Sequence, residues 1–295
     1  MKTLTVFTPT YNRAYCLHQV YESLCRQTSQ DFLWLVIDDG STDETNDLVA
    51  SWKKEAKIEI HYHYKENGGM HTGHNVAYSL IDTELNVCID SDDYMPEDAV
   101  ELIIKKWKKE GGNQFAGILG LDIDKNGNVI GTKFPEDLMH CKYSELKRKH
   151  GVVGDIKFVY KTDIIKKYMP YPVFKGEKFV PLGYPYALID KNYDMLCSNE
   201  IYCIVEYQPD GSTKNIIKQY INNPKGFAHE RKKLMVAWPF FMDRFRFSIH
   251  YISSSIFLKN KNFIKESPRK IMTVFAIPFG VLLHLYILYL NKKNT

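Results

Sequence analysis

Three carboxylates, Asp90, Asp92 and Asp93, directly follow the apolar run Leu85–Ile89. The run is short, contains valine and isoleucine and is bounded by turn formers, so it predicts a buried strand. Acidic groups at the carboxyl end of such a strand stand where open α/β sheets bind ligands. On an extended chain, Asp90 and Asp92 point to the same side, where a cation would join them. Oxygen ligands suit Mg²⁺ or Mn²⁺ beside substrate phosphates; the alternative is an acidic turn in which Asp93 caps the next helix.

Strands and helices alternate around this stretch through the first 110 residues. The predicted strands are 3–9, 32–37, 58–64 and 85–89. The predicted helices are 13–27, 43–56 (capped by Ser41 or Thr42), 72–82 and 96–110. Such alternation predicts an α/β fold with a mostly parallel sheet covered by helices on both faces.

The pattern changes after residue 110. Strands are predicted at 115–121 and 128–134, around the turn Asp124–Gly127, and again at 156–161. Residues 165–190 are rich in proline, glycine and aromatics, which suits a loop region that contacts substrate. We therefore expect a domain over residues 1–230, divided into a nucleotide half (1–110) and an acceptor half (111–230), followed by a tail (231–295).

The tail is basic and apolar. Residues 214–295 carry fifteen Lys or Arg against three acids, a net charge of +12, whereas residues 1–213 are at −8. Residues 271–290 are uncharged and just long enough to span a bilayer as a helix. Pro278 and His284 favour a helix that lies in the membrane surface over one that spans it. A more polar stripe (Thr273, Ile277, Gly280, His284) leaves open that the helix packs on the domain instead. The apolar content favours a membrane partner over nucleic acid.

The cysteines and the N-terminus indicate a cytoplasmic protein. The six cysteines form no Cys-x-x-Cys pair, and we expect reduced thiols. The chain begins directly with a predicted strand and without a signal peptide. With the basic tail, this places the protein at the inner face of the cell membrane.

Four polar stretches follow predicted strands or open a predicted helix. They are Thr8–Arg13, Ile37–Asp43, Asn67–Asn75 and Asp90–Asp93. Because the carboxyl ends of parallel strands meet at one edge of a sheet, we expect the four stretches to form a nucleotide site there.

In this order the four stretches resemble the family 2 glycosyltransferases, inverting enzymes of the GT-A fold. The resemblance is strong over residues 1–110 and continues weakly to about 230. It implies transfer of a hexosyl or N-acetylhexosaminyl group from a nucleotide sugar, which we expect to be UDP-linked. The basic tail adds the expectation of a lipid-linked or growing glycan as acceptor in the synthesis of cell-surface polysaccharide.

The resemblance also implies roles for individual residues. Asp92 would be the main metal ligand and Asp90 a second. Asp93 would support these two ligands without binding the metal itself. His74 stands where the family often has arginine, so its positive charge would depend on pH. The residues implied to bind the nucleotide sugar are Pro9, Thr10, Tyr11, Asn12, Arg13, Asp39, Gly68, Gly69, His74, Asn75, Asp90 and Ser91.

The family requires a general base that deprotonates the acceptor hydroxyl. Many relatives carry a Glu-Asp pair for this purpose, and this chain lacks that pair. Glu177, in Gly176-Glu177-Lys178, is the best match, with Asp155 and Asp190 as rivals. His229 and Arg231 are further candidates for contact with the diphosphate.

Two competing functions follow from the same residues. One is a sensor or membrane scaffold that binds a sugar nucleotide without turnover, an alternative that the missing Glu-Asp pair keeps open. The other is a sugar nucleotidyltransferase. That class places a glycine-rich, basic phosphate loop after the first strand, where this chain has Thr8–Arg13.

Overall fold

The computed structural model describes residues 2–206 and 215–293. They form two compact units. The sheet unit contains the described residues up to Pro170 and those from Asn192 to Glu206. The helical unit contains Tyr171–Lys191 and the described residues from Asn215 onward. The expected boundary between 230 and 231 falls inside a helix, and the two units divide the chain elsewhere.

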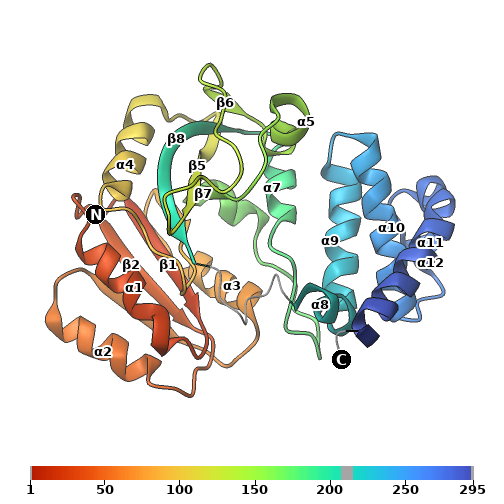
Figure 1. The fold of residues 1–295 in the computed structure, drawn as a ribbon, viewed down its shortest axis with the longest axis horizontal. Coiled ribbons are helices and arrows are strands. Elements are labelled where there is room, and N and C mark those ends of the chain that lie inside the picture. Colours follow the sequence, from red (N-terminus) through yellow and green to blue (C-terminus); the bar gives the residue numbers. More distant parts are fainter. Residues whose placement is uncertain (1, 207–214, 294–295) are drawn as a thin grey trace. The chain divides into compact units, whose positions relative to one another are not determined.

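The sheet unit is built on a mixed sheet whose strand order, within the described residues, is β3-β2-β1-β4-β7-β5-β8-β6 (Figure 1). The strands are β1 (Leu4–Thr10), β2 (Phe32–Asp38), β3 (Ile60–Tyr64), β4 (Leu85–Cys88), β5 (Phe115–Asp124), β6 (His140–Cys141), β7 (Ile156–Lys161) and β8 (Asp194–Val205). The helices of this unit are α1 (Ala14–Cys25), α2 (Thr45–Glu55), α3 (Met70–Leu80), α4 (Ala99–Glu110), α5 (Leu146–His150) and α6 (Thr162–Ile165), with 3₁₀ turns at Tyr143–Glu145 and Lys166–Tyr168.

The first four strands are mutually parallel, as their alternation with helices predicts. The remainder is mixed, because β7 runs antiparallel to both β4 and β5, while β8 is parallel to β5. The α/β fold class is therefore confirmed, and the parallel arrangement belongs mainly to its first half.

Both faces of the parallel half are covered. Alternate residues of β1 point to opposite faces, so Val6 joins a core with α1, α2 and α4 while Phe7 packs on α3. Trp34 lies in the same core as Val6 and packs beside Tyr21 of α1 and Trp52 of α2, whose rings stack on each other at 4.5 Å between centroids. This packing holds the strands in register and so determines where each strand ends.

The strand predicted at 128–134 is wrong. The turn forms, with the Asp124 carboxylate accepting hydrogen bonds from the backbone N–H groups of Asn126 and Asn128 at 2.8 and 2.9 Å. Beyond it only isolated bridges occur, at Val129 and at Gly131, which meets Gly154. Both glycines have a positive φ, and a Cβ on either would collide with the other's backbone. The chain therefore bends toward Gly154 and does not extend the hairpin.

The expected cap of the second helix is also wrong. The helix begins at Thr45, whose backbone N–H and hydroxyl donate to the Asp43 carboxylate at 3.1 and 2.6 Å. Ser41 and Thr42 instead contact the loop after β1.

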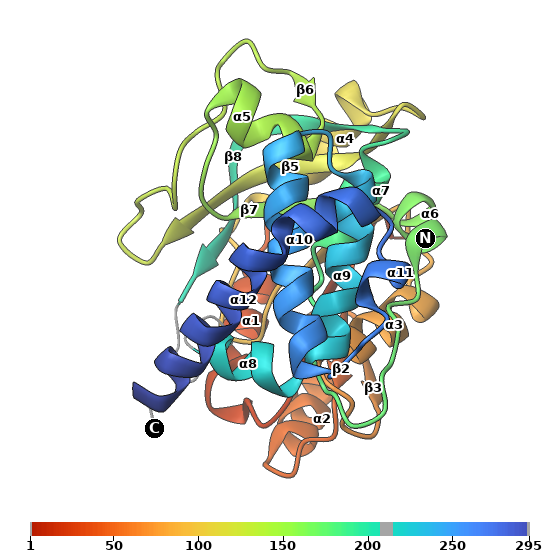
Figure 2. The same ribbon diagram turned by 90° about the vertical axis from the view of Figure 1, so that its right-hand side faces the viewer.

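The helical unit consists of α7 (Tyr184–Ile189), α8 (Ile216–Asn222), α9 (Pro224–Ala237), α10 (Phe241–Phe257), α11 (Phe263–Glu266) and α12 (Lys270–Lys293). Figure 2 shows α12 crossing α10 obliquely, and α10 packs against both α12 and α9. A Cβ added at Gly280 would lie 2.5 Å from Cβ of Ile252, so only glycine permits this close helix packing. The predicted polar stripe is buried at Thr273 and Gly280, and His284 packs on Phe257 with ring centroids 4.2 Å apart.

Candidate functional site

Three parallel strands bring the polar stretches to one edge of the sheet. Thr10 pairs with Asp38 in register, and Phe7 pairs with Cys88, so β1, β2 and β4 end at the same side. The backbone N–H of Asp39 donates to the Thr10 carbonyl at 2.8 Å, which extends the pairing into the loops. The edge predicted from the alternation of strands and helices is therefore present.

Asn12 connects the first stretch to the second. Its backbone N–H donates to the Ser41 hydroxyl at 2.9 Å, and its side-chain carbonyl accepts from the Thr42 N–H at 2.8 Å. Asn12 has a φ of 52°, a left-handed conformation that asparagine tolerates better than most residues. Tyr11 and the half-buried Arg13 flank it, and the Tyr11 side chain is exposed.

Asp39 connects the second stretch to the third. Its two carboxylate oxygens accept from the backbone N–H groups of Gly68 and Gly69, at 2.9 and 2.7 Å, and from the Asn67 amide at 3.3 Å. The Lys65 ammonium donates to the same carboxylate. Asp39 is buried, and its hydrogen bonds hold the loop that leads into α3. Lys65 lacks a sequence signal of its own and was missed by the motif analysis.

His74 connects the third stretch to the fourth. It is buried, with its ring edge-on to Phe7 at 5.1 Å between centroids. The Cys88 sulfur lies 3.8 Å from His74 Nε2 and 3.8 Å from Asp90 Oδ1. Burial lowers the pKa of His74 to about 4, and the charge of Asp90 only partly opposes this. The imidazole is therefore neutral at pH 7, and any contribution to donor binding is that of an uncharged ring.

Burial of neutral His74 makes the stability of the sheet unit depend on pH. The unfolded chain binds a proton below about pH 6.5, whereas folded His74 does so only near its pKa of about 4. The stabilisation is complete above pH 6.5 and is lost as the pH falls toward 4. We expect His74 to reduce the free energy of unfolding by about 2 kcal/mol between pH 7 and pH 5.

Urea unfolding of the wild type and of His74→Phe at both pH values measures this effect. The variant keeps an aromatic ring on Phe7 but cannot titrate. Its free energy of unfolding should therefore fall by about 2 kcal/mol less than that of the wild type between pH 7 and pH 5. Equal losses in the two proteins would show that His74 does not remain neutral.

The acidic stretch folds as a turn and not as an extended chain. The backbone N–H of Asp93 donates to the Asp90 carbonyl at 3.0 Å, so the extended-chain reason for bringing Asp90 and Asp92 together is wrong. Ser91 is buried, while the Asp90 and Asp92 side chains remain partly accessible. Asp92 is close enough to the start of α1 for its charge to raise the pKa of the Cys16 thiol, beside the larger effect of burial.

Asp93 faces the interior and does not cap α4. Its carboxylate accepts from the Glu206 N–H at 3.2 Å and lies 3.9 Å from the Lys157 ammonium, which is also 3.9 Å from Asp122. Burial raises the pKa of both Asp93 and Asp122, and the Lys157 charge opposes this. Lys157 therefore holds the buried side of the acidic turn through Asp93, although no sequence motif points to this lysine.

Asp90 and Asp92 supply two partly accessible carboxylates at the turn after β4. No group of three or more His, Cys, Asp or Glu side chains that could hold a metal occurs within residues 2–206 and 215–293. Two carboxylates offer oxygen ligands only, which suits Mg²⁺ or Mn²⁺ when substrate phosphates supply further oxygens.

Glu177 lies in the helical unit, at the N-terminus of α9. Its two carboxylate oxygens accept from the backbone N–H groups of Lys225 and Gly226, both at 2.9 Å. This contact stabilises the start of the helix. Of its rivals, Asp155 is exposed in the sheet unit and Asp190 is buried in the helical unit.

The further candidates for the diphosphate also lie in the helical unit, on α9. Burial lowers the pKa of His229 to about 4, so it is neutral at pH 7. The Arg231 guanidinium pairs with the Glu230 carboxylate at 3.1 Å.

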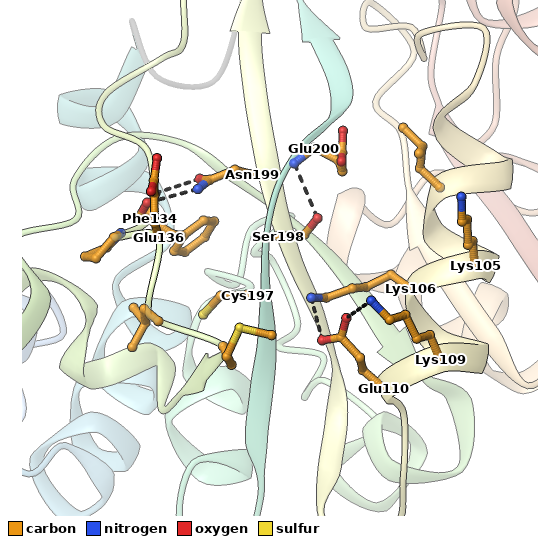
Figure 3. A pocket seen from close by; sticks show the side chains of 14 residues that line it. Lys105, Lys106, Lys109, Glu110, Phe134, Glu136, Cys197, Ser198, Asn199 and Glu200 are labelled. Carbon is orange, nitrogen blue, oxygen red and sulfur yellow. Dashed lines mark hydrogen bonds and ion pairs between the residues drawn. The ribbon is translucent and has the colours of Figure 1, made fainter.

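A separate pocket of about 320 Å³ lies between α4 and β8 (Figure 3). Lys106 and Lys109 pair there with Glu110, and the Asn199 amide bonds the backbone of Phe134. No residue of the four polar stretches lines this pocket. The candidate site is therefore the edge described above and not this pocket.

Comparisons with known proteins identify the family and the fold of this chain. The family model described as glycosyl transferase family 2 matches residues 5–168, which contain all four polar stretches. Poly(ribitol-phosphate) β-N-acetylglucosaminyltransferase TarP of Staphylococcus aureus (strain N315) is 25% identical over 217 residues, covering 70% of this chain and 63% of TarP. An uncharacterized glycosyltransferase of Rickettsia felis is 29% identical over 147 residues, or 47% of this chain. The match spans only 24% of that protein's own length.

Solved structures share the fold at low sequence identity. S. aureus TarS 1–349 in complex with UDP-GlcNAc has a TM-score of 0.63 at 16% identity, covering 95% of this chain and 81% of TarS 1–349. The mannosyltransferase PcManGT from Pyrobaculum calidifontis, in complex with GDP-Man and Mn²⁺, has a TM-score of 0.56 at 15% identity, covering 96% and 87%. These likenesses confirm the GT-A fold. Since the family model covers more than half of the chain, this protein belongs to glycosyl transferase family 2.

Proposed function

We propose that this protein is an inverting glycosyltransferase that moves a sugar from a UDP-linked donor to a growing or lipid-linked glycan. The observation that carries the proposal is the chain of contacts along one sheet edge. It runs from Asn12 to Ser41, from Asp39 to Gly69, and from His74 through Cys88 to Asp90. Four separate stretches are thereby held as one surface at the position where α/β sheets bind nucleotides.

The residues of this surface have distinct roles in the proposal. Asp39 holds the loop of Gly68 and Gly69 in place, so that the N-terminal amides of α3 face the anionic diphosphate. Asp90 and Asp92 would hold Mg²⁺ or Mn²⁺, which when bound neutralises the nucleoside diphosphate leaving group. TarS with UDP-GlcNAc and PcManGT with Mn²⁺ support a nucleotide-sugar donor and a metal by analogy of fold.

The proposal assigns the general base to Glu177. A carboxylate in that role removes the proton of the acceptor hydroxyl as its oxygen attacks the anomeric carbon. The two backbone contacts of Glu177 fix the direction of its side chain, which a base requires, but they also give it a structural role.

Calorimetric titration of the purified full chain with UDP, with and without Mn²⁺, tests the donor site. We expect UDP binding that Mn²⁺ strengthens. If UDP, GDP and dTDP all fail to bind, the four stretches do not form a nucleotide site. Binding of GDP or dTDP alone would leave the reaction class intact and change the donor.

We further propose that α12 attaches the protein to the inner face of the cell membrane and lies in the membrane surface. Within residues 2–206 and 215–293, α12 is the one helix long and apolar enough to cross a membrane, yet one side of it packs against α10. Its other side exposes a row of large apolar residues: Ile271, Phe275, Phe279, Leu282, Leu285, Tyr286 and Tyr289. A helix with one packed and one exposed apolar side suits insertion parallel to the membrane.

Replacing two residues of this exposed side by acids should release the protein from vesicles. In Leu282→Glu/Leu285→Glu we expect at least a tenfold loss of affinity for vesicles that contain phosphatidylglycerol, because each buried leucine contributes about 2 kcal/mol. Vesicle co-sedimentation measures the loss. The control Val153→Glu changes an exposed apolar residue of the sheet unit and should sediment like the wild type. Unchanged sedimentation of the double variant would refute the attachment.

A further inference from the structure

A groove of about 740 Å³ lies in the helical unit, where α10 and α12 begin. Its walls are apolar and largely aromatic, with Phe241 and Phe245 contributed by α10 and Ile271 and Phe275 by α12. Arg269 and Lys270 stand at the start of α12 and also line it. Among the described residues that line the groove there is no carboxylate.

The apolar walls are unusually exposed. The exposed fractions are 64% for Phe241, 77% for Ile271 and 70% for Phe275. Leaving such side chains in water costs free energy that a hydrocarbon chain in the groove would recover. The groove also continues the exposed apolar side of α12, so a chain lying in it would extend into the same hydrocarbon layer.

Arg269 lines the groove, and Arg244, which does not line it, lies close enough for the two charges to interact. Arg269 Nε donates to the Met235 carbonyl at 3.2 Å, and Arg244 Nε donates to the Trp238 carbonyl. Burial lowers the pKa of Arg244, and the nearby charge of Arg269 lowers it further. Arg269 and Lys270 are the two cations that line the groove, and together they form a favourable place for a phosphate.

We propose that this groove binds one anionic phospholipid of the membrane, with its hydrocarbon chain between the aromatic walls and its phosphate at Arg269 and Lys270. The proposal rests on the membrane attachment described above and specifies its lipid. A second copy of the chain is a poorer occupant, because the segment from residue 214 carries a net charge of +12 and two such faces repel each other.

Trp238 provides a local probe. It is the one tryptophan of the helical unit, since Trp34, Trp52 and Trp107 lie in the sheet unit, and its carbonyl accepts the Arg244 contact. We expect neutral-detergent micelles that contain phosphatidylglycerol with brominated chains to quench its fluorescence more strongly than brominated phosphatidylcholine at the same mole fraction. In Trp238→Phe this difference between the two lipids should disappear.

Two variants test the groove itself. Arg269→Gln removes the proposed phosphate contact. Met272→Phe narrows the groove, which Met272 lines, without adding a second tryptophan to the helical unit. Each should raise the phosphatidylglycerol concentration at half-maximal quenching at least fivefold. Val153→Glu changes an exposed residue of the sheet unit that does not line the groove, and it should keep the wild-type value.

Equal quenching by the two lipids, or unchanged half-maximal concentrations in both groove variants, would overturn the proposal. Circular dichroism spectra confirm that each variant is folded. Leu282→Glu/Leu285→Glu tests membrane attachment in vesicles, whereas the groove variants test lipid selection in micelles. The attachment proposal and the lipid proposal can therefore fail independently. Concentration-dependent dimerisation that Met272→Phe abolishes, without lipid quenching, would assign the groove to a second copy and also overturn the lipid proposal.

Discussion

Asp92→Asn is expected to weaken Mn²⁺-dependent UDP binding at least a hundredfold, which corresponds to about 3 kcal/mol. The substitution removes one of the two proposed carboxylate ligands, Asp90 and Asp92, at the turn after β4. A neutral amide oxygen is a weaker ligand for a hard divalent cation, and the negative charge that attracts the metal falls by one. UDP binding measured without metal should change little, because Asp39 and the loop it holds remain intact.

Asp98→Asn is the matched control for this experiment. It changes an exposed aspartate at the start of α4, five residues after the acidic turn, and should bind UDP and Mn²⁺ as the wild type does. If Asp92→Asn retained full Mn²⁺-dependent binding while Asp90→Asn lost it, Asp90 would be the main ligand. If both variants retained it, the metal site would not be at this turn.

Glu177→Gln is expected to lower kcat by a factor of about 10² to 10⁴, the usual contribution of a general base. KM for the donor should be nearly unchanged, because Glu177 lies outside the four stretches that form the proposed nucleotide site. The variant also loses one acceptor and the negative charge at the N-terminus of α9, so the free energy of unfolding should fall by about 1 kcal/mol.

The size of the two effects separates catalysis from helix capping. A loss of stability alone, with kcat within a factor of about three of the wild type, would leave Glu177 as a capping residue. Asp190→Asn and Asp155→Asn would then identify the base, since those two carboxylates are the remaining candidates. If UDP binds to the wild type but no donor sugar is ever consumed, the protein binds a sugar nucleotide without turnover.

Much of the nucleotide half follows from local patterns along the chain. Short apolar runs that alternate with helices predict parallel strands, and parallel strands bring their carboxyl ends to one edge. Thr8–Arg13, Ile37–Asp43 and Asp90–Asp93 could therefore be placed together without coordinates. The second half was harder to predict, because antiparallel β7 joins two parallel groups and the bend at Gly131 depends on contact with Gly154.

The residue types at the edge where β1, β2 and β4 end were determined by the sequence itself, and so was the order in which they follow the strands. The environment of each group was decided only by tertiary structure, because burial and hydrogen-bond partners come from residues far away in the chain. His74 is neutral because Phe7 and its neighbours exclude water from it, and the Asp39 carboxylate is held by Gly68 and Gly69, about thirty residues later. Likewise, Glu177 meets the N-terminus of α9 nearly fifty residues further along the chain, a contact that no local spacing encodes.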